Sequence, residues 1–230
     1  MRAEAKIGGE VVSLPKPKAI LFDWDNTLVN SWPVIHQALS ETFVAYGREP
    51  WSLETVMGNV RYSLRDSFPE LFGEKWEEVR EYFYGRFRAI HLEALIPMAG
   101  AGEMLQALYG DGIFLGVVSN KTGNYLRDEA DHLDWTGYFG EIIGAGDAAR
   151  DKPAPDPLTM LLERAGLTAG PEIWFVGDSG VDMEIAHRTG CSAVLIHQDN
   201  PEADEFHKHP PQLDVVNSIG LLKAVRDLMD

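Results

Sequence analysis

Between residue 99 and the C-terminus, the sequence alternates between short, fully apolar segments and segments with helical spacing. Apolar runs end at Val118, Val176 and Ile196, and helix-like patterns separate them. Strands that are apolar on both sides belong in a parallel sheet with helices packed on both faces. This alternation predicts an α/β fold, a doubly wound parallel sheet, which binds ligands at the carboxyl ends of its strands.

The apolar and helical patterns predict the approximate bounds of the individual elements. Strands are expected over residues 19–22, 113–118, 142–143, 172–176 and 193–196, with a minor strand at 11–12. Helices are expected over residues 100–109, 124–133, 155–165, 181–188 and 218–229. Ser218 is the expected N-cap of the last helix, and the acidic, proline-rich residues 198–211 are expected to form a surface loop.

A long helical stretch interrupts this alternation directly after the first strand. Pro33 begins a run of apolar residues at helix spacing, and Gly47 ends it. Residues 51–95 remain helical in character and contain no convincing strand. The sequence therefore predicts an all-helical subdomain, residues 31–96, inserted into a core formed by residues 1–30 and 97–230.

Composition excludes several classes of partner and compartment. The formal net charge of −16 would repel a nucleic-acid backbone or an anionic membrane surface. The single cysteine, Cys191, excludes an internal disulfide framework and fits a reducing compartment. No apolar stretch approaches a membrane span, and the N-terminus lacks the apolar region of a signal peptide. We therefore expect a soluble, cytoplasmic protein with no nucleic-acid or membrane partner.

Two acids, Asp23 and Asp25, follow the first expected strand directly. In an extended backbone, residues i and i+2 project to the same side, so both carboxylates would share one small volume. Two such charges repel, and one pKa rises unless a cation lies nearby. This segment therefore calls for a metal ion or for a proton held between the pair.

Other strand ends supply polar residues that suit phosphate-ester chemistry. The second long strand ends at Ser119 and Asn120, the loop after the third contains Lys152, and the fourth leads to Asp178 with Asp182 four residues on. Carboxylate oxygens are the ligands that Mg²⁺ prefers. The lysine and the hydroxyl could bind phosphoryl oxygens beside that ion.

Four motifs occur in order, each after the expected kind of element: Asp23-Trp24-Asp25-Asn26-Thr27-Leu28, Ser119-Asn120, Lys152-Pro153 and Gly177-Asp178-Ser179-x-x-Asp182. Together they resemble the haloacid dehalogenase (HAD) superfamily, in particular its phosphoglycolate phosphatase-like members. The resemblance implies a Rossmann-like catalytic core with residues 31–96 as a helical cap. It also implies a Mg²⁺-dependent phosphatase that hydrolyses a small phosphate monoester, with phosphoglycolate as one candidate, through an aspartyl-phosphate intermediate.

The resemblance also implies roles for individual residues. Asp23 would be the nucleophile, and Asp25 would protonate the leaving group and then deprotonate the attacking water. Phosphate would be bound by Ser119, Lys152, Thr27 and Asn120. The metal would be bound by Asp23, the backbone carbonyl of Asp25, Asp178 and Asp182. Two of these assignments have alternatives. Thr27 could cap the following turn instead of contacting phosphate, and Asn120 could be a turn residue or could bind phosphate through its backbone.

The inserted segment and two departures from the family pattern bear on the substrate. Arg61 and Arg65 are candidates for substrate contacts from one helix face, and a solvated basic face is the alternative. Asn26 stands where many relatives have Gly, and Asn tolerates the unusual backbone angles expected there. Asn30 stands where phosphoglycolate phosphatases commonly have Asp, which weakens that specific assignment without affecting the chemistry.

Two other functions remain open from the sequence. A phosphomutase or another phosphotransferase would use a sugar instead of water as the acceptor, and a non-catalytic protein could retain the fold. The non-catalytic alternative is disfavoured because the sequence retains all four of Asp23, Asp25, Lys152 and Asp178. The expected partner is a small phosphorylated metabolite, and the sequence fits a monomer or a homodimer.

Overall fold

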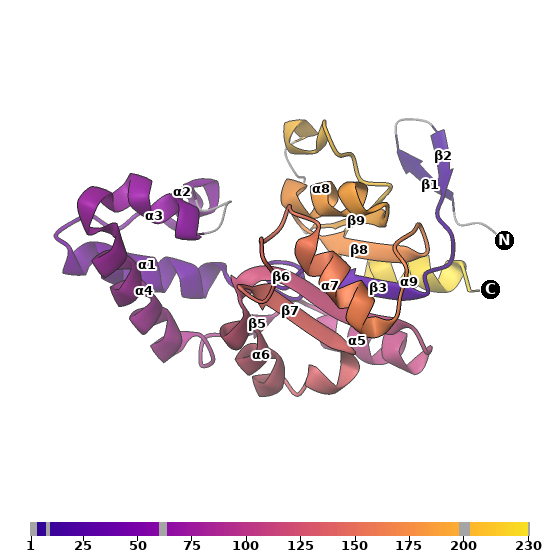
Figure 1. The fold of residues 1–230 in the computed structure, drawn as a ribbon, viewed down its shortest axis with the longest axis horizontal. Coiled ribbons are helices and arrows are strands. Elements are labelled where there is room, and N and C mark those ends of the chain that lie inside the picture. The colour runs from indigo at the N-terminus through magenta and orange to yellow at the C-terminus, as the bar shows by residue number, and fades with distance from the viewer. Residues whose placement is uncertain (1–3, 8–9, 60–63, 198–202, 230) are drawn as a thin grey trace. The chain divides into compact units, whose positions relative to one another are not determined.

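The computed structural model describes residues 4–7, 10–59, 64–197 and 203–229. The chain forms two compact units, one of residues 1–29 and 97–230 and the other of residues 30–96 (Figure 1). Across the described ranges, no helix has both the length and the apolar character needed to cross a membrane.

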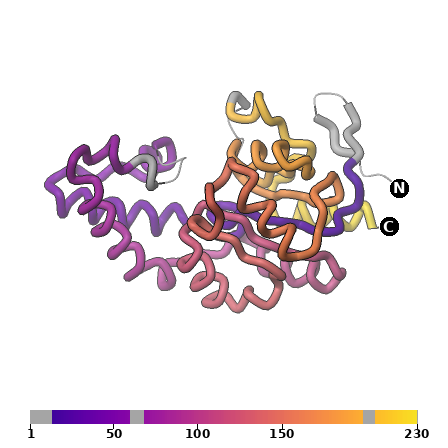
Figure 2. The backbone as a smooth tube through the Cα atoms, viewed as in Figure 1, coloured from indigo at the N-terminus to yellow at the C-terminus, as the bar shows by residue number. Residues whose placement is uncertain are grey.

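A six-stranded sheet forms the centre of the first unit, in the order β10-β9-β8-β3-β6-β7. Its strands are β3 (Ala19–Phe22), β6 (Phe114–Thr122), β7 (Glu141–Ala145), β8 (Ile173–Gly177), β9 (Ser192–Ile196) and β10 (Leu213–Val215). Each neighbouring pair is parallel. Within this sheet, the chain runs from the central β3 outward through β6 and β7, and then crosses to β8 on the other side of β3 (Figure 2). The predicted doubly wound parallel sheet is confirmed, and its switch point lies between β3 and β8.

Helices pack on both faces of this sheet because its strands are apolar on both sides. They are α5 (Ala101–Gly110), α6 (Gly123–His132), α7 (Asp156–Ala165), α8 (Gly180–Thr189) and α9 (Ser218–Asp227). Leu161 of α7 and Met183 of α8 pack with Leu21 of β3 and Phe175 of β8 in one buried cluster. In Figure 1, α7 lies in front of the strands and α9 behind them.

Three features of the sheet unit differ from the sequence prediction. Strand β6 continues through Ser119 to Thr122, although this segment is polar. Strand β10 was not predicted, because it has three residues and its central Asp214 is exposed. The N-cap of α9 is Asn217, whose side chain accepts a hydrogen bond from the Gly220 N–H at 3.0 Å, so the assignment of Ser218 as the cap is wrong. An antiparallel hairpin, β1 (Glu4–Ile7) and β2 (Glu10–Ser13), precedes β3, and β2 includes the minor strand expected at residues 11–12.

In the part of the second unit that the structure describes, the α-helices are α1 (Trp32–Ala45), α2 (Leu53–Asn59), α3 (Leu64–Phe72) and α4 (Trp76–Ile90). Buried aromatic rings fill its interior, with Phe68 and Phe83 at a centroid distance of 5.4 Å and Phe43 and Phe72 at 5.5 Å. The short strands β4 (Val29–Asn30) and β5 (Ile96–Pro97) pair with each other. These aromatic side chains thus serve as packing within the unit.

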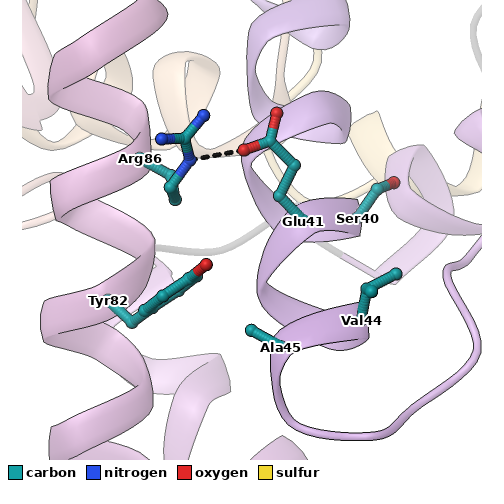
Figure 3. A pocket seen from close by; sticks show the side chains of 6 residues that line it. All are labelled: Ser40, Glu41, Val44, Ala45, Tyr82 and Arg86. Atoms are coloured by element: carbon teal, nitrogen blue, oxygen red, sulfur yellow. Dashed lines mark hydrogen bonds and ion pairs between the residues drawn. The ribbon is translucent and has the colours of Figure 1, made fainter.

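A pocket of about 390 Å³ opens between α1 and α4 within this unit (Figure 3). Six residues line it: Ser40, Glu41, Val44, Ala45, Tyr82 and Arg86. Arg86 forms an ion pair with Glu41 across the pocket. Because the cation is already neutralised, these six residues do not form an evident phosphate site.

Candidate active site

The loop that follows β3 is held against β8 by its backbone. The Asp23 N–H donates to the carbonyl of Val176 at 2.8 Å, and the Leu28 N–H donates back to the Trp24 carbonyl at 2.9 Å. Asn26 lies in the left-handed region, with φ of 62°. Asn tolerates this conformation better than most residues with a side chain, so the loop forms with Asn at this position. These contacts place Asp23 and Asp25 at the carboxyl edge of the sheet.

Three carboxylates from separate elements meet at this edge. Asp23 follows β3, Asp178 follows β8, and Asp182 lies in the first turn of α8. One carboxylate oxygen from each lies within 4.8 Å of the others. An all-oxygen set of hard ligands suits Mg²⁺. These three residues could therefore hold one divalent cation.

Lys152 lies among these carboxylates, in the loop between β7 and α7. Its Nζ donates to Asp23 Oδ1 at 2.7 Å and to Asp182 Oδ1 at 2.6 Å, and its side chain is 3% exposed. A buried ammonium between two carboxylates is stabilised only when it is paired in this way. The structure thus brings the predicted lysine to Asp23 across 129 residues of sequence and to Asp182 across 30.

Asn120 positions the backbone of Lys152. Its Oδ1 accepts a hydrogen bond from the Lys152 N–H at 2.9 Å, and its Nδ2 donates to the Lys152 carbonyl at 3.0 Å. Both ends of the amide are therefore used to fix the loop that presents the lysine. A contact between the Asn120 backbone and phosphate stays a prediction.

The structure describes the side chains of some of the other candidate residues but not of all. Ser119 is buried at the end of the apolar part of β6, and its Oγ accepts from the Lys121 N–H at 3.2 Å. The Thr27 hydroxyl donates to Asp178 Oδ1 over 3.4 Å, so it contacts a metal-ligand candidate.

Arg61 lies outside the described residues, as does the side chain of Arg65, whose backbone is part of α3. Their role in substrate binding is untested.

Burial and neighbouring charges shift the pKa values of the acids in the cluster. Burial raises the pKa of Asp23 to about 6, even though the Lys152 ammonium acts in the opposite direction. Burial, together with the carboxylates of Asp182 and Asp23, raises the pKa of Asp178 well above its usual value. Burial alone would lower the pKa of Lys152, but Asp182 and Asp23 raise it above its usual value. Without a metal, the site therefore has more buried negative charge than one lysine can compensate.

Residues 20–196 match the family model described as haloacid dehalogenase-like hydrolase. This match covers β6 to β9, nearly all of β3, the helical insert and every candidate site residue. The chain belongs to this family. The resemblance that the four motifs indicate is thereby confirmed.

Relatives within the haloacid dehalogenase-like family narrow the activity. The phosphoglycolate phosphatase of Xylella fastidiosa (strain 9a5c) is 30% identical over 208 residues, covering 84% of this chain and 90% of the relative. The enzyme of the same name from Aquifex aeolicus is 31% identical over 182 residues, covering 77% and 84%. A crystal structure of a predicted phosphoglycolate phosphatase from Haemophilus somnus superposes with a TM-score of 0.77 and 25% identity over 90% of this chain and 97% of that one. This HAD-family chain is a phosphatase.

Sequence reasoning missed a second buried lysine at the site of this HAD phosphatase. Lys121 Nζ donates to Asp25 Oδ1 at 2.6 Å and to Glu129 Oε2 at 2.7 Å. The sequence predicts that the strand ends at Val118, so Lys121 is not among the expected site residues. A signal was present, because Glu129 falls on the otherwise apolar face of α6 with Leu126 and Ala130, where an acid needs a partner.

Gly177 is required at the end of β8 because α8 approaches it closely. A Cβ at this position would lie 2.3 Å from Asp182 Cγ, and Asp182 is fixed by the Ser179 hydroxyl at 2.6 Å and by Lys152. Gly177→Ala is expected to lower the free energy of unfolding by about 1–3 kcal/mol and to weaken Mg²⁺ binding. Denaturant titrations with and without Mg²⁺ measure both effects.

Gly170→Ala is the matched control for this substitution, since a Cβ there meets no atom within 4 Å. It is expected to change neither the stability nor the Mg²⁺ affinity appreciably. Equal behaviour of the two alanine variants would contradict the close approach of Gly177 to Asp182.

The raised pKa of Asp23 predicts how stability depends on pH in metal-free protein. An aspartate that titrates at 3.8 in the unfolded chain and at about 6 in the folded one leaves the folded state with more bound protons, so its ionisation costs stability across this window. Asp23→Asn should therefore become progressively more stable than the wild type as the pH rises from 3.8 to about 6. Denaturation in EDTA across this range measures the difference, and a difference that shrinks with rising pH would contradict the prediction.

Proposed function

We propose that this HAD phosphatase hydrolyses a small phosphate monoester with Mg²⁺ bound by Asp23, Asp178, Asp182 and the Asp25 backbone carbonyl, through a phosphorylated Asp23. The observation that carries this proposal is the convergence of Asp23, Asp178 and Asp182 around Lys152 at the switch point of the sheet. Phosphate monoesters hydrolyse extremely slowly in water. A site that concentrates cationic groups beside a carboxylate nucleophile supplies the charge stabilisation that such a reaction needs.

The proposed reaction has two displacements at phosphorus. In the first, an Asp23 carboxylate oxygen bonds to phosphorus, the bond to the leaving oxygen breaks, and Asp25 gives that oxygen a proton. In the second, Asp25 takes a proton from water, the water oxygen bonds to phosphorus, and the bond to Asp23 breaks. Splitting one difficult step into two is the usual advantage of a covalent nucleophile, and one carboxyl group can serve as acid and then as base.

Other residues bind and orient the phosphoryl group in this scheme. Lys152 and Ser119 neutralise or donate to its oxygens, and Asn120 holds the backbone of Lys152 in place. A bound Mg²⁺ ion would supply further positive charge to the phosphoryl oxygens. Thr27, which contacts Asp178, would support the ligand set.

Phosphoglycolate is the first substrate to test, because the relatives from Xylella fastidiosa and Aquifex aeolicus are named phosphoglycolate phosphatase. Asn30 counts against this narrow assignment, since phosphoglycolate phosphatases commonly have Asp there. The proposal for the substrate is therefore separate from the proposal for the chemistry, and one experiment can test both.

The experiment measures phosphate release from a panel of phosphorylated metabolites and a generic aryl phosphate, with Mg²⁺ and with EDTA. Mg²⁺-dependent release from the aryl ester supports the chemistry, and a kcat/KM that is highest for phosphoglycolate supports the narrow assignment. Sugar phosphates in the panel, analysed for transferred phosphate, would reveal a phosphomutase. No release from any ester with any divalent metal would contradict the proposal.

A further inference from the structure

The two acids of the Asp23-Trp24-Asp25 segment are bound by different lysines. Lys152 contacts Asp23, whereas Lys121 contacts Asp25 at 2.6 Å. Lys121 and Asp25 lie 96 residues apart in the chain, on β6 and in the loop after β3. The side chain of Lys121 is 6% exposed and that of Asp25 is 26% exposed. One Asp25 oxygen is thus fixed from inside the protein while the residue remains accessible to a substrate.

Glu129 anchors Lys121 in this position. The Glu129 side chain is 1% exposed and accepts from Lys121 Nζ at 2.7 Å. The same oxygen, Oε2, also accepts from Trp24 Nε1 at 2.7 Å. A buried carboxylate with two donors has a well-defined position, because leaving either donor would expose its charge to an apolar environment.

Trp24 connects Glu129 to the backbone of the loop that follows β3. Its side chain is fully buried and packs edge-on against Trp135, with ring centroids 5.9 Å apart, and against Phe139 at 6.4 Å. Trp24 also separates Asp23 from Asp25 in the sequence. The chain Trp24–Glu129–Lys121–Asp25 therefore closes into a ring of contacts around the loop, and none of these contacts uses the side chains of Asp23, Asp178 or Asp182.

We propose that Lys121, anchored by Glu129 and Trp24, is a positioning residue that holds the Asp25 carboxyl group where it can exchange a proton with the leaving-group oxygen. This inference rests on the proposed function, in which Asp25 is the general acid. Proton transfer requires hydrogen-bond reach, so its efficiency depends on the rotamer of Asp25. Without Lys121, the partly exposed Asp25 side chain loses this restraint on its rotamer.

The test compares two esters in Lys121→Met, which keeps the unbranched side chain up to Cε and removes the ammonium. An alkyl phosphate needs a protonated leaving group, whereas a dinitrophenyl phosphate has a leaving group stable enough to depart without a proton. We use kcat/KM, which reports the steps up to departure of the leaving group. Lys121→Met is expected to lower the alkyl-to-dinitrophenyl ratio of kcat/KM by on the order of 100-fold, the scale of general acid catalysis.

Four further variants keep the test decisive. Asp25→Asn should lower the same ratio, and adding Lys121→Met to it should cause no further decrease, because both changes remove one function. Glu129→Gln retains an acceptor for Trp24 and should shift the ratio in the same direction by less, which covers the case in which Lys121→Met does not fold. Lys223→Met, in the exposed ion pair of α9, is the control and should leave the ratio unchanged.

Equal losses for both esters in Lys121→Met or in Glu129→Gln would overturn the inference, because a purely structural or phosphate-binding role affects both esters alike. Failure of the proposed function has a different signature. It would appear in the wild-type protein as the absence of Mg²⁺-dependent hydrolysis of either ester.

Discussion

Asp23→Asn is expected to reduce phosphate release by on the order of 10⁴-fold or more, the scale seen when a covalent nucleophile is removed. The amide keeps the size of the carboxyl group and can still accept a hydrogen bond from Lys152, which lies 2.7 Å from Asp23 Oδ1 in the wild type. The loss would therefore reflect chemistry and not collapse of the site. Initial rates with the aryl phosphate at saturating Mg²⁺ measure it.

The control for this variant is its stability in metal-free buffer. Burial raises the pKa of Asp23 to about 6, so the ionised carboxylate destabilises the folded state at neutral pH, and Asp23→Asn should melt at a higher temperature than the wild type. An inactive variant with increased stability separates function from folding. Full activity in Asp23→Asn would exclude Asp23 as the nucleophile.

Removing divalent metal is expected to have the second largest effect, with phosphate release falling at least about a thousandfold in EDTA. The physical reason is that the cluster has three carboxylates and one buried lysine, so without a cation its negative charge is not fully compensated. Mg²⁺ at about 100 times its dissociation constant should add roughly 2.7 kcal/mol to the free energy of unfolding. For a chain of 230 residues this corresponds to about 5–10 °C in Tm.

Asp178→Asn is the matched variant for the metal prediction. It removes one ligand charge, and because the pKa of Asp178 is raised well above its usual value, it should also stabilise the metal-free protein. The Mg²⁺-induced increase in Tm should become much smaller in this variant. An unchanged increase would mean that the ion binds elsewhere, and undiminished activity of the wild type in EDTA would contradict metal-assisted hydrolysis.

Most of the sheet could be predicted because its strands are buried on both sides and thus have a continuous apolar signature. Strand β3 begins and ends at the predicted residues, and β8 and β9 are each shifted by one residue at most. Strand β10 could not be found in this way, because an edge strand of three residues needs only two buried side chains. Asn217 caps α9 through a side-chain contact that Ser218 could equally have made.

The acids and Lys152 could be predicted because strand ends in a parallel sheet share one edge. The contacts of Lys121 could not, because they depend on the register between β6 and α6 and on the exact direction of the Asp25 side chain. Asn120 shows the same limit, since its sequence position fits a turn, a phosphate contact or the backbone clamp on Lys152 that the structure has. The sequence therefore predicts that the candidate catalytic residues lie at this edge of the sheet. Only the structure shows that Asp23 pairs with Lys152 and Asp25 with Lys121.

The stereochemical course at phosphorus tests most directly whether the convergent site transfers phosphate through Asp23. A thiophosphate monoester made chiral at phosphorus with two oxygen isotopes would be hydrolysed in water of the third isotope by the wild-type protein with Mg²⁺, and the configuration of the product thiophosphate determined. Two successive in-line displacements, first by Asp23 and then by water, predict net retention of configuration. Inversion would show that water attacks the ester directly and would contradict the role of Asp23.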